Sequence, residues 1–392
     1  MNNSEIHVLI LASWFPDQNM ASHGIFIKDQ ALLLKKHGYQ VTVIHAELTG
    51  TYLSSIGKKS MVNIDIEEGL TIARLSVPPC LPYFRNSNYA YVFKECYKVL
   101  PQLQENKVPF TLVHSHSAFL GGYLGMRIAE LLNIPWVHTE HSSGLIFKLE
   151  QYSKSDLSLV RTMFQKAKTV GFVSQFSANR TLENLGLPWT PSYRLLPDFI
   201  SDEAFEKPLR SSIHPKKFIF IGDNISVKNP SLLMDVWERF IEKYPLSELS
   251  IIGNGYSESY MINRFKGTVK ILPRQSHESL LAYLAAHDVV LSTSSVETFG
   301  LSVAEAQAMG IPAVVTDSGG VKDFITKESG IIKSLDADDF YNGMVQMMNE
   351  YQRFDSFVIR EKMKNRYASH YLIQELNVIY REAIHGNSNF KS

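Results

Sequence analysis

The feature that most constrains this chain is an alternation of short apolar runs with segments of helical spacing. Residues 6–11 form a compact apolar run, and 25–37 place apolar side chains at helical spacing until Gly38 ends the pattern. Further predicted strands lie at 41–44, 112–114, 135–138 and 170–173, with helices at 120–132 and 176–185. Strands separated by helices of this size predict a parallel sheet covered on both faces.

The same alternation of predicted strands and helices begins again after a polar stretch at 197–217. Predicted strands lie at 218–221, 249–252, 269–272, 289–292 and 313–316, and predicted helices at 230–244, 279–286 and 302–309. We therefore predict an α/β protein with two doubly wound, Rossmann-like domains, residues 1–200 and 201–365.

Composition excludes several classes of protein. Apolar residues make up 45% of the chain, and 39 basic residues balance 39 acidic ones, which argues against a disordered chain and a basic nucleic-acid binder. The two cysteines, Cys80 and Cys96, fit a reduced compartment. Apolar runs stay well short of the roughly 18 residues that span a bilayer, and the start reads as strand and turn rather than signal peptide. We expect a cytoplasmic protein.

The predicted architecture also indicates where a ligand binds. Open parallel sheets bind ligands beyond the carboxyl ends of their strands, where helix N-termini offer free N–H donors. Two such domains facing across a cleft would present donors on both walls, which predicts a phosphate-bearing substrate. The nicotinamide fingerprint is incomplete, because Gly253-Asn254-Gly255 is followed by Glu258 where a third glycine belongs.

Residues 288–323 carry most of the functional signal. A buried strand ends at 292–295, the chain turns through 297–300, and a helix is predicted to start near Ser302. The N–H groups of 300–303 would form an anion site. Glu297 before the helix and Glu305 in its first turn could bind hydroxyls on both sides of a diphosphate. Two plainer interpretations stay open: Ser302 and Glu305 also form a capping box, and Glu297 could be an ordinary exposed loop carboxylate.

Glu297 and Glu305, separated by seven residues within ETFGLSVAEAQAMGIPAVVTDSGG, resemble the signature of the retaining glycosyltransferases of family 4, which have the two-domain GT-B fold. The resemblance covers nearly the whole chain. It includes the opening segment from His7, which contains Gly24. It also includes four later segments: VHSHSAFLGG (113–122), YRLLPDFISDEAF (193–205), FIGDNISVKNP (220–230) and DSGGVKDFI (317–325), the last followed by Gly330.

The resemblance implies transfer of a sugar from a nucleotide-diphosphate donor to a glycan or lipid-linked acceptor hydroxyl, with retention and without metal or cofactor. It implies surface polysaccharide or glycolipid assembly as the setting. Glu297 would contact the donor sugar and Glu305 the ribose. The other implied site residues are His116 near the reacting sugar, Gly24 near the phosphates, and Phe299, Gly300 and Leu301 along the sugar and diphosphate. A terminal helix in 366–392 would cross back to the first domain.

One residue departs from the resembled pattern. The family usually has Arg, four residues, then Lys; this chain keeps Lys228 but has Asp223 at the Arg position. A carboxylate there would repel a diphosphate by roughly a few kcal/mol. Lys228, Arg274 or Lys322 could supply the positive charge that the diphosphate needs. Alternatively, the alignment is off by a residue, or the chain is a weakened or non-catalytic relative. We favour the first interpretation. The alternative functions are a nucleotide-sugar epimerase and a catalytically silent nucleotide-sugar-binding protein.

Further candidates are histidines, a pair of aspartates and an aromatic segment. We expect His114 and His116 to point to opposite faces of their strand, with His114 as buried scaffolding. His141 either lines the acceptor side or caps a helix. Asp336 and Asp338 are expected to be structural residues at a helix start. Residues 82–98 are aromatic and basic, which favours either helix core or an acceptor or membrane-facing surface, with peripheral contact on the inner face of the membrane.

Overall fold

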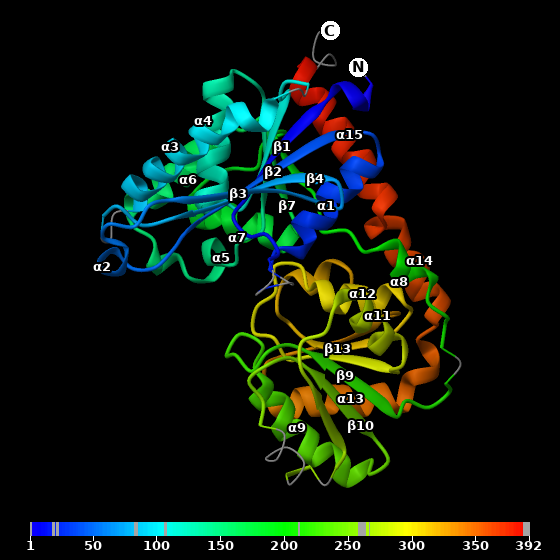
Figure 1. Cartoon of the computed structure of the whole chain (residues 1–392). Coiled ribbons are helices and arrows are strands. Elements are labelled where there is room, and N and C mark those ends of the chain that lie inside the picture. Colours follow the sequence, from blue (N-terminus) through cyan, green and yellow to red (C-terminus); the bar gives the residue numbers. More distant parts are fainter. Residues whose placement is uncertain are drawn as a thin grey trace. The chain divides into compact units, whose positions relative to one another are not determined.

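The computed structural model describes residues 2–17, 20, 23–81, 85–105, 108–210, 212–257, 264–265 and 267–386. The chain forms two compact units. Unit 1 comprises Met1–Val173, Ala178–Pro197 and Leu372–Ser392, and unit 2 comprises Ser174–Ser177 and Asp198–Tyr371. Unit 1 therefore includes most of the last helix of the chain, α15 (Ser369–His385), drawn in red in Figure 1.

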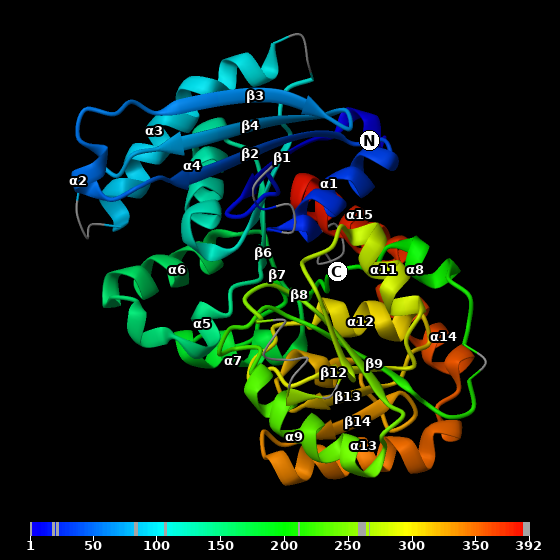
Figure 2. The ribbon, with the colours of Figure 1, turned by 60° about the horizontal axis from the view of Figure 1, so that its bottom comes forward.

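Within the described residues, the sheet of unit 1 has eight strands in the order β3-β4-β2-β1-β5-β6-β7-β8 (Figure 2). β3 and β4 pair antiparallel, and the other neighbours pair parallel. All six side chains of β1 are buried, as expected of a central strand covered on both faces. The strands are β1 (His7–Ala12), β2 (Gln40–Leu48), β3 (Met61–Glu67), β4 (Leu70–Val77), β5 (Leu112–His116), β6 (Trp136–Glu140), β7 (Thr169–Phe172) and β8 (Tyr193–Leu195).

The two faces of this sheet bury different sets of side chains. Leu9 and Leu11 of β1 belong to a large apolar core shared with the helices on one face. On the other face, α1 and α15 reach His114 of β5 through Gln30 and Tyr380. Besides α15, the helices are α1 (Ile25–Lys36), α2 (Tyr52–Ser55), α3 (Arg85–Gln104), α4 (Tyr123–Leu132), α5 (Gly144–Phe147), α6 (Lys154–Lys166) and α7 (Gln175–Leu185), with short turns η1 (Asn3–Glu5), η2 (Ala118–Gly122) and η3 (Leu149–Gln151).

Unit 2 has a six-stranded, all-parallel sheet among its described residues, in the order β11-β10-β9-β12-β13-β14. Trp237 and Phe240 of α9 pack with Phe340 of α13 in its core. The strands are β9 (Lys217–Ile221), β10 (Glu248–Ile252), β11 (Val269–Leu272), β12 (Val289–Ser292), β13 (Ala313–Thr316) and β14 (Gly330–Lys333). The helices are α8 (Asp202–Glu206), α9 (Pro230–Lys243), α11 (His277–Ala285), α12 (Leu301–Ala308), α13 (Ala337–Glu350) and α14 (Ser356–Tyr367), with η4 (Gly320–Asp323) and η5 (Tyr351–Arg353).

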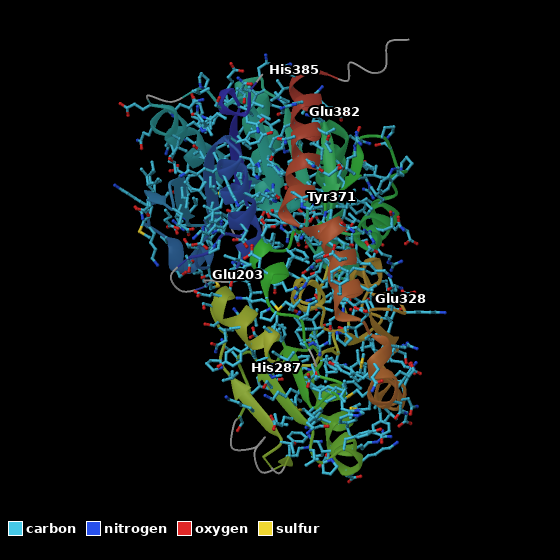
Figure 3. The ribbon with its side chains drawn as sticks, turned by 90° about the vertical axis from the view of Figure 1, so that its right-hand side faces the viewer. Glu203, His287, Glu328, Tyr371, Glu382 and His385 are labelled. Carbon is cyan, nitrogen blue, oxygen red and sulfur yellow. The ribbon has the colours of Figure 1, made fainter. Side chains whose placement is uncertain are left out.

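The C-terminal segment forms two helices rather than one continuous helix. Ala368 has extended backbone and separates α14 from α15. Figure 3 labels Tyr371 near the start of α15 and Glu382 and His385 near its end. Within unit 1, Glu382 pairs with Arg194 at 3.0 Å.

The prediction of two parallel-sheet α/β domains is confirmed, with one addition. The antiparallel pair β3 and β4 lies in a stretch for which the sequence predicted no strand. Asp336 caps α13 by accepting from the N–H groups of Asp338 and Asp339, so this acidic motif is structural, as predicted. In the part of the chain that the structure describes, no helix has the length and apolar character needed to cross a membrane.

Candidate functional site

The carboxyl edge of the unit 2 sheet brings several loops together. Parallel strands place their carboxyl ends at one edge, so the loops after β9, β12 and β13 become neighbours. Ser295 N–H donates to the Val227 carbonyl at 2.9 Å, and Glu297 N–H donates to the Ser318 carbonyl at 2.7 Å. Gly320 N–H donates back to the Glu297 carbonyl at 2.9 Å. The backbone of Glu297 is therefore held on both sides by the loop after β13.

The Glu297 carboxylate is held as firmly as its backbone. Lys228 Nζ lies 2.6 Å from Glu297 Oε1, and the Ser294 hydroxyl donates to the same oxygen at 2.7 Å. The side chain of Glu297 is only 16% exposed. The interpretation of Glu297 as an ordinary exposed loop carboxylate is therefore wrong. Lysine and carboxylate form a charge-assisted pair at the strand ends.

Helix α12 begins one residue earlier than predicted and has a different cap. Gly300 is the N-cap in the left-handed region, with φ 97°, and a β-carbon there would lie 2.7 Å from Val321 Cγ1. Ser302 is thus inside the helix, and the capping-box interpretation is wrong. Val303 N–H donates to the Gly300 carbonyl at 3.1 Å, so it is not one of the free donors predicted at residues 300–303. The candidate anion donors are then the N–H groups of residues 300–302.

Glu305 lies in the second turn of α12, not in its first turn as predicted. Its side chain is 5% exposed, and Oε1 accepts from His277 Nε2 at 2.7 Å. His277 opens α11, which Ser276 caps by accepting from the Ser279 N–H. Sequence reasoning missed His277, because it lies 28 residues before Glu305 and belongs to no motif with it. This bond fixes one carboxylate oxygen of Glu305.

Asp223 has a basic partner. Arg274 Nε donates to Asp223 Oδ1 at 3.1 Å, and a second guanidinium nitrogen bonds Oδ2. Asn254 N–H also donates to Oδ1, at 2.9 Å. The hydrogen bond from Arg274 lowers the pKa of Asp223, and Asp223 in turn raises the pKa of Arg274. Arg274 therefore neutralises the unexpected carboxylate at this edge of the sheet.

In unit 1, the predicted histidines lie on one face of β5. His114 and His116 stack with ring centroids 4.4 Å apart, so the expectation of opposite faces is wrong: residues two apart on a strand share a face. His116 Nδ1 lies 3.0 Å from His141 Nε2, and both His114 and His116 are fully buried. His114 is scaffolding, as predicted, bonded to Tyr380 at 2.6 Å.

Gly24 and His141 complete the predicted residues of this unit. Gly24 caps α1 with φ 74°, and a β-carbon would lie 2.5 Å from the Trp14 carbonyl oxygen. Glycine is therefore required for the close approach of two backbone segments. The His141 ring packs against Phe26 in a tilted arrangement, with centroids 4.6 Å apart. The N-cap of α5 is Ser143, so His141 caps no described helix.

Two family descriptions match the chain. The family described as Glycosyltransferase Family 4 matches residues 24–195, and Glycosyl transferases group 1 matches residues 201–366. The chain belongs to these glycosyltransferase families.

Curated relatives agree with this assignment. D-inositol 3-phosphate glycosyltransferase of Corynebacterium kroppenstedtii is 27% identical over 318 residues, covering 71% of this chain and 66% of the relative. The protein of the same name from Corynebacterium jeikeium is 26% identical over 236 residues, covering 52% and 55%. Mannosylfructose-phosphate synthase of Agrobacterium fabrum is 23% identical over 249 residues, covering 54% and 55%. The chain thus spans between 55% and 66% of the length of these relatives.

Solved structures of glycosyltransferases share the fold. Sucrose-phosphate synthase from Thermosynechococcus elongatus aligns with a TM-score of 0.73 at 18% identity, covering 96% of this chain and 98% of that one. A glycosyltransferase from Rickettsia africae aligns with a TM-score of 0.70 at 16% identity, covering 98% and 99%. Anabaena Alr3699/HepE in complex with UDP-glucose aligns with a TM-score of 0.66 at 14% identity, covering 95% and 98%. The fold is GT-B.

Two of the predicted site residues contribute differently than expected. The Phe299 ring is 2% exposed and packs on Phe324 and Tyr367, with centroids 5.5 and 5.4 Å away. Its side chain therefore cannot lie along a sugar, and only its backbone reaches the N-terminus of α12, beside Leu301. Lys322 pairs with Asp317 on its own loop at 2.9 Å, and its side chain is 47% exposed.

The packing of the loops in unit 2 predicts a large effect at Gly320. A β-carbon there would lie 2.2 Å from the Thr298 carbonyl oxygen and 2.7 Å from the Phe299 nitrogen. We expect Gly320→Ala to lower the free energy of unfolding by about 3 kcal/mol, because two backbone segments must separate. Gly267→Ala is the control: it has φ 78° but no described heavy atom within 4 Å, so it should cost only about 1 kcal/mol. Equal losses in urea titrations would contradict this packing.

The buried histidines of unit 1 predict acid sensitivity. Burial lowers the pKa of His114 and of His141 from 6.5 to about 3, and that of His116 well below 6.5. These rings bind protons in the unfolded chain but not in the folded one, so stability is complete above pH 6.5 and falls as the pH decreases below it. Well below pH 6.5, each histidine should lower the free energy of unfolding by about 1.4 kcal/mol for every pH unit of acidification. Urea titrations between pH 7.5 and 5 measure it, and a flat profile would contradict the burial.

Proposed function

We propose that this glycosyltransferase moves a sugar from a nucleotide-diphosphate donor to an acceptor hydroxyl, with retention of configuration and without a metal ion. The observation that carries the proposal is the pair of Glu297 and Lys228 at the carboxyl edge of the unit 2 sheet, directly before α12. An ammonium group beside a helix N-terminus suits a diphosphate, and a carboxylate suits sugar hydroxyls. A glycan or lipid-linked acceptor of surface polysaccharide or glycolipid assembly is the substrate class we propose.

The roles of the unit 2 residues follow from their polar atoms. Lys228 and the first N–H groups of α12, at Gly300 and Leu301, would stabilise the diphosphate as negative charge grows on it during departure. Glu297 would accept hydrogen bonds from the donor sugar. Glu305, with one oxygen fixed by His277, would offer the other oxygen to the ribose hydroxyls. His116 and Gly24 of unit 1 remain candidates for the reacting sugar and the phosphates.

The pairing of Asp223 with Arg274 supports an active enzyme. The argument for a catalytically silent protein rested on an unbalanced carboxylate at residue 223, and Arg274 supplies the missing positive charge. The Arg274 side chain is 53% exposed, so its outer face can still meet an anion. We propose that Arg274 binds the donor phosphates, with Asp223 fixing its orientation.

This arrangement predicts an asymmetric response to two substitutions. Arg274→Gln should raise the KM for the donor about tenfold, because it removes a cation and leaves Asp223 unbalanced. Asp223→Asn should change it less than threefold, because the amide keeps one acceptor for the guanidinium. Steady-state kinetics at fixed acceptor measure both values. A larger effect of Asp223→Asn than of Arg274→Gln would contradict the assignment.

His277 provides a separate test of the ribose site. His277→Ala frees Glu305 Oε1 and should raise the donor KM about fivefold with little change in kcat, since the bond lies away from the reacting sugar. His277→Gln keeps a donor within reach and should recover most of the affinity. A fall in kcat at unchanged KM in His277→Ala would refute a positioning role.

Proton NMR of the reaction products tests the proposed function. Nucleotide sugars are incubated with and without glycan or lipid-linked acceptors, and with and without a chelator. The proposal expects an acceptor-dependent product with the anomeric configuration of the donor, at the same rate with chelator. Conversion of the donor sugar without any acceptor would show an epimerase. Donor binding with no turnover towards any acceptor would favour the silent nucleotide-sugar-binding protein.

A further inference from the structure

A cluster of exposed apolar side chains lies on α2 and β3 of unit 1. Leu53 and Ile56 are 79% and 68% exposed, and Met61 at the start of β3 is 70% exposed. We call residues 52–62 the α2–β3 surface. Such a concentration of large apolar side chains in so short a stretch indicates a binding surface rather than ordinary surface.

The topology places this surface at one edge of the sheet. α2 follows β2, and β3 begins at Met61, which pairs with Ser76 near the end of β4. Figure 2 shows α2 beyond the ends of β2, β3 and β4. Since β2 and β5 both run parallel to β1, the surface lies at the carboxyl edge of the sheet, the edge at which His116 ends β5. This is the edge where a parallel sheet binds its ligands.

One face of the helix that the sequence suggested as a membrane-facing surface belongs to the core. In α3, Tyr89 and Val92 are 7% and 0% exposed and belong to the apolar core of unit 1. Residues 82–84 of the suggested segment lie outside the described residues. Leu53, Ile56 and Met61 are each more exposed than Tyr97, the large apolar side chain that α3 exposes, at 54%.

The charges of the α2–β3 surface have one sign. Lys58 and Lys59 are exposed, and the stretch from 48 to 64 contains no aspartate or glutamate. Among the described residues, neither lysine takes part in an ion pair. Apolar side chains flanked by unpaired lysines match the two layers of an anionic membrane, its acyl chains and its phosphate headgroups.

We propose that the α2–β3 surface docks this protein on anionic lipid bilayers, with Leu53 and Ile56 inserted and Lys58 and Lys59 on the headgroup phosphates. A second copy of the chain is the less suitable occupant. In a two-fold interface the same patch faces itself, which would bring four lysines towards one another without a counter-charge. The proposal rests on exposure and charge alone, and does not depend on the transfer reaction.

Cosedimentation of the full chain with vesicles tests this docking. Vesicles of phosphatidylcholine alone are compared with vesicles that also contain phosphatidylglycerol. The wild-type chain should sediment with the anionic vesicles and stay in the supernatant with the neutral ones. The double variant Leu53→Asn/Ile56→Asn should partition onto the anionic vesicles at least about tenfold less than the wild type. The double variant Lys58→Ser/Lys59→Ser should partition about tenfold less. Binding of the wild type should weaken at high salt.

Leu246→Asn is the matched control, since Leu246 is 76% exposed but lies in unit 2; it should sediment like the wild type. Thermal unfolding verifies that each variant is folded, and the lysine variant tests the proposal even if the apolar one unfolds. Wild-type chain that stays in the supernatant with both vesicles would overturn the proposal. So would variants that sediment like the wild type. Concentration-dependent dimers that the Leu53→Asn/Ile56→Asn variant abolishes, without vesicle binding, would identify a second copy as the occupant instead.

Discussion

Glu297→Gln is expected to reduce sugar transfer by about 10²- to 10³-fold, the range typical for loss of one stabilising group at a reacting centre. The change keeps the size of the side chain but removes the charge that holds Lys228 Nζ at 2.6 Å. It also removes the acceptor proposed for the donor sugar. Release of nucleoside diphosphate in the presence of donor and acceptor measures the rate.

The control for this variant is Glu328→Gln. Glu328 also pairs with a lysine, Lys362, at 3.2 Å, but it is 61% exposed and follows η4 on another part of unit 2. The Glu328→Gln protein should transfer sugar at the wild-type rate. A Glu297→Gln protein with the wild-type rate would show that this carboxylate takes no part in the reaction.

Lys228→Ala is expected to weaken binding of the nucleoside diphosphate itself by about 30-fold or more, as for truncation of one partner in a partly buried charged contact. The variant loses the ammonium and leaves Glu297, 16% exposed, without its counter-charge. Isothermal titration with the diphosphate alone separates this effect from sugar recognition, because Glu297→Gln should bind the diphosphate nearly normally.

Lys322→Ala is the comparison for Lys228→Ala. Lys322 is exposed and already paired with Asp317, so its removal should alter diphosphate affinity less than threefold. A large effect at Lys322 with none at Lys228 would move the phosphate site from the loop after β9 to the loop after β13.

Most strands could be predicted because they are buried on both faces. The runs 218–221 and 289–291 are continuous and apolar, which is the pattern of a parallel strand under two layers of helices. β3 could not be predicted in this way. It is an edge strand whose residues are largely exposed, and its apolar side chains reflect no buried face.

The site was only partly predictable for a different reason. Glu297 and Lys228 were both expected at the donor site through the family resemblance, but their ion pair depends on the pairing of β9 with β12, which the sequence pattern does not specify. The contacts of Glu305 with His277 and of Asp223 with Arg274 depend on loop conformations and rotamers that a sequence pattern does not specify. The cap of α12 was misplaced because Ser302 is a familiar capping residue, whereas the structure uses the left-handed Gly300.

Titration of the full chain with a panel of UDP-, GDP- and ADP-sugars, by calorimetry, tests the central claim most directly. We predict saturable binding of at least one nucleotide sugar, competition by its free nucleoside diphosphate, and at least about 30-fold weaker binding by Lys228→Ala. Absence of binding to every nucleotide sugar in the panel, or equal binding by the wild type and Lys228→Ala, would contradict the account.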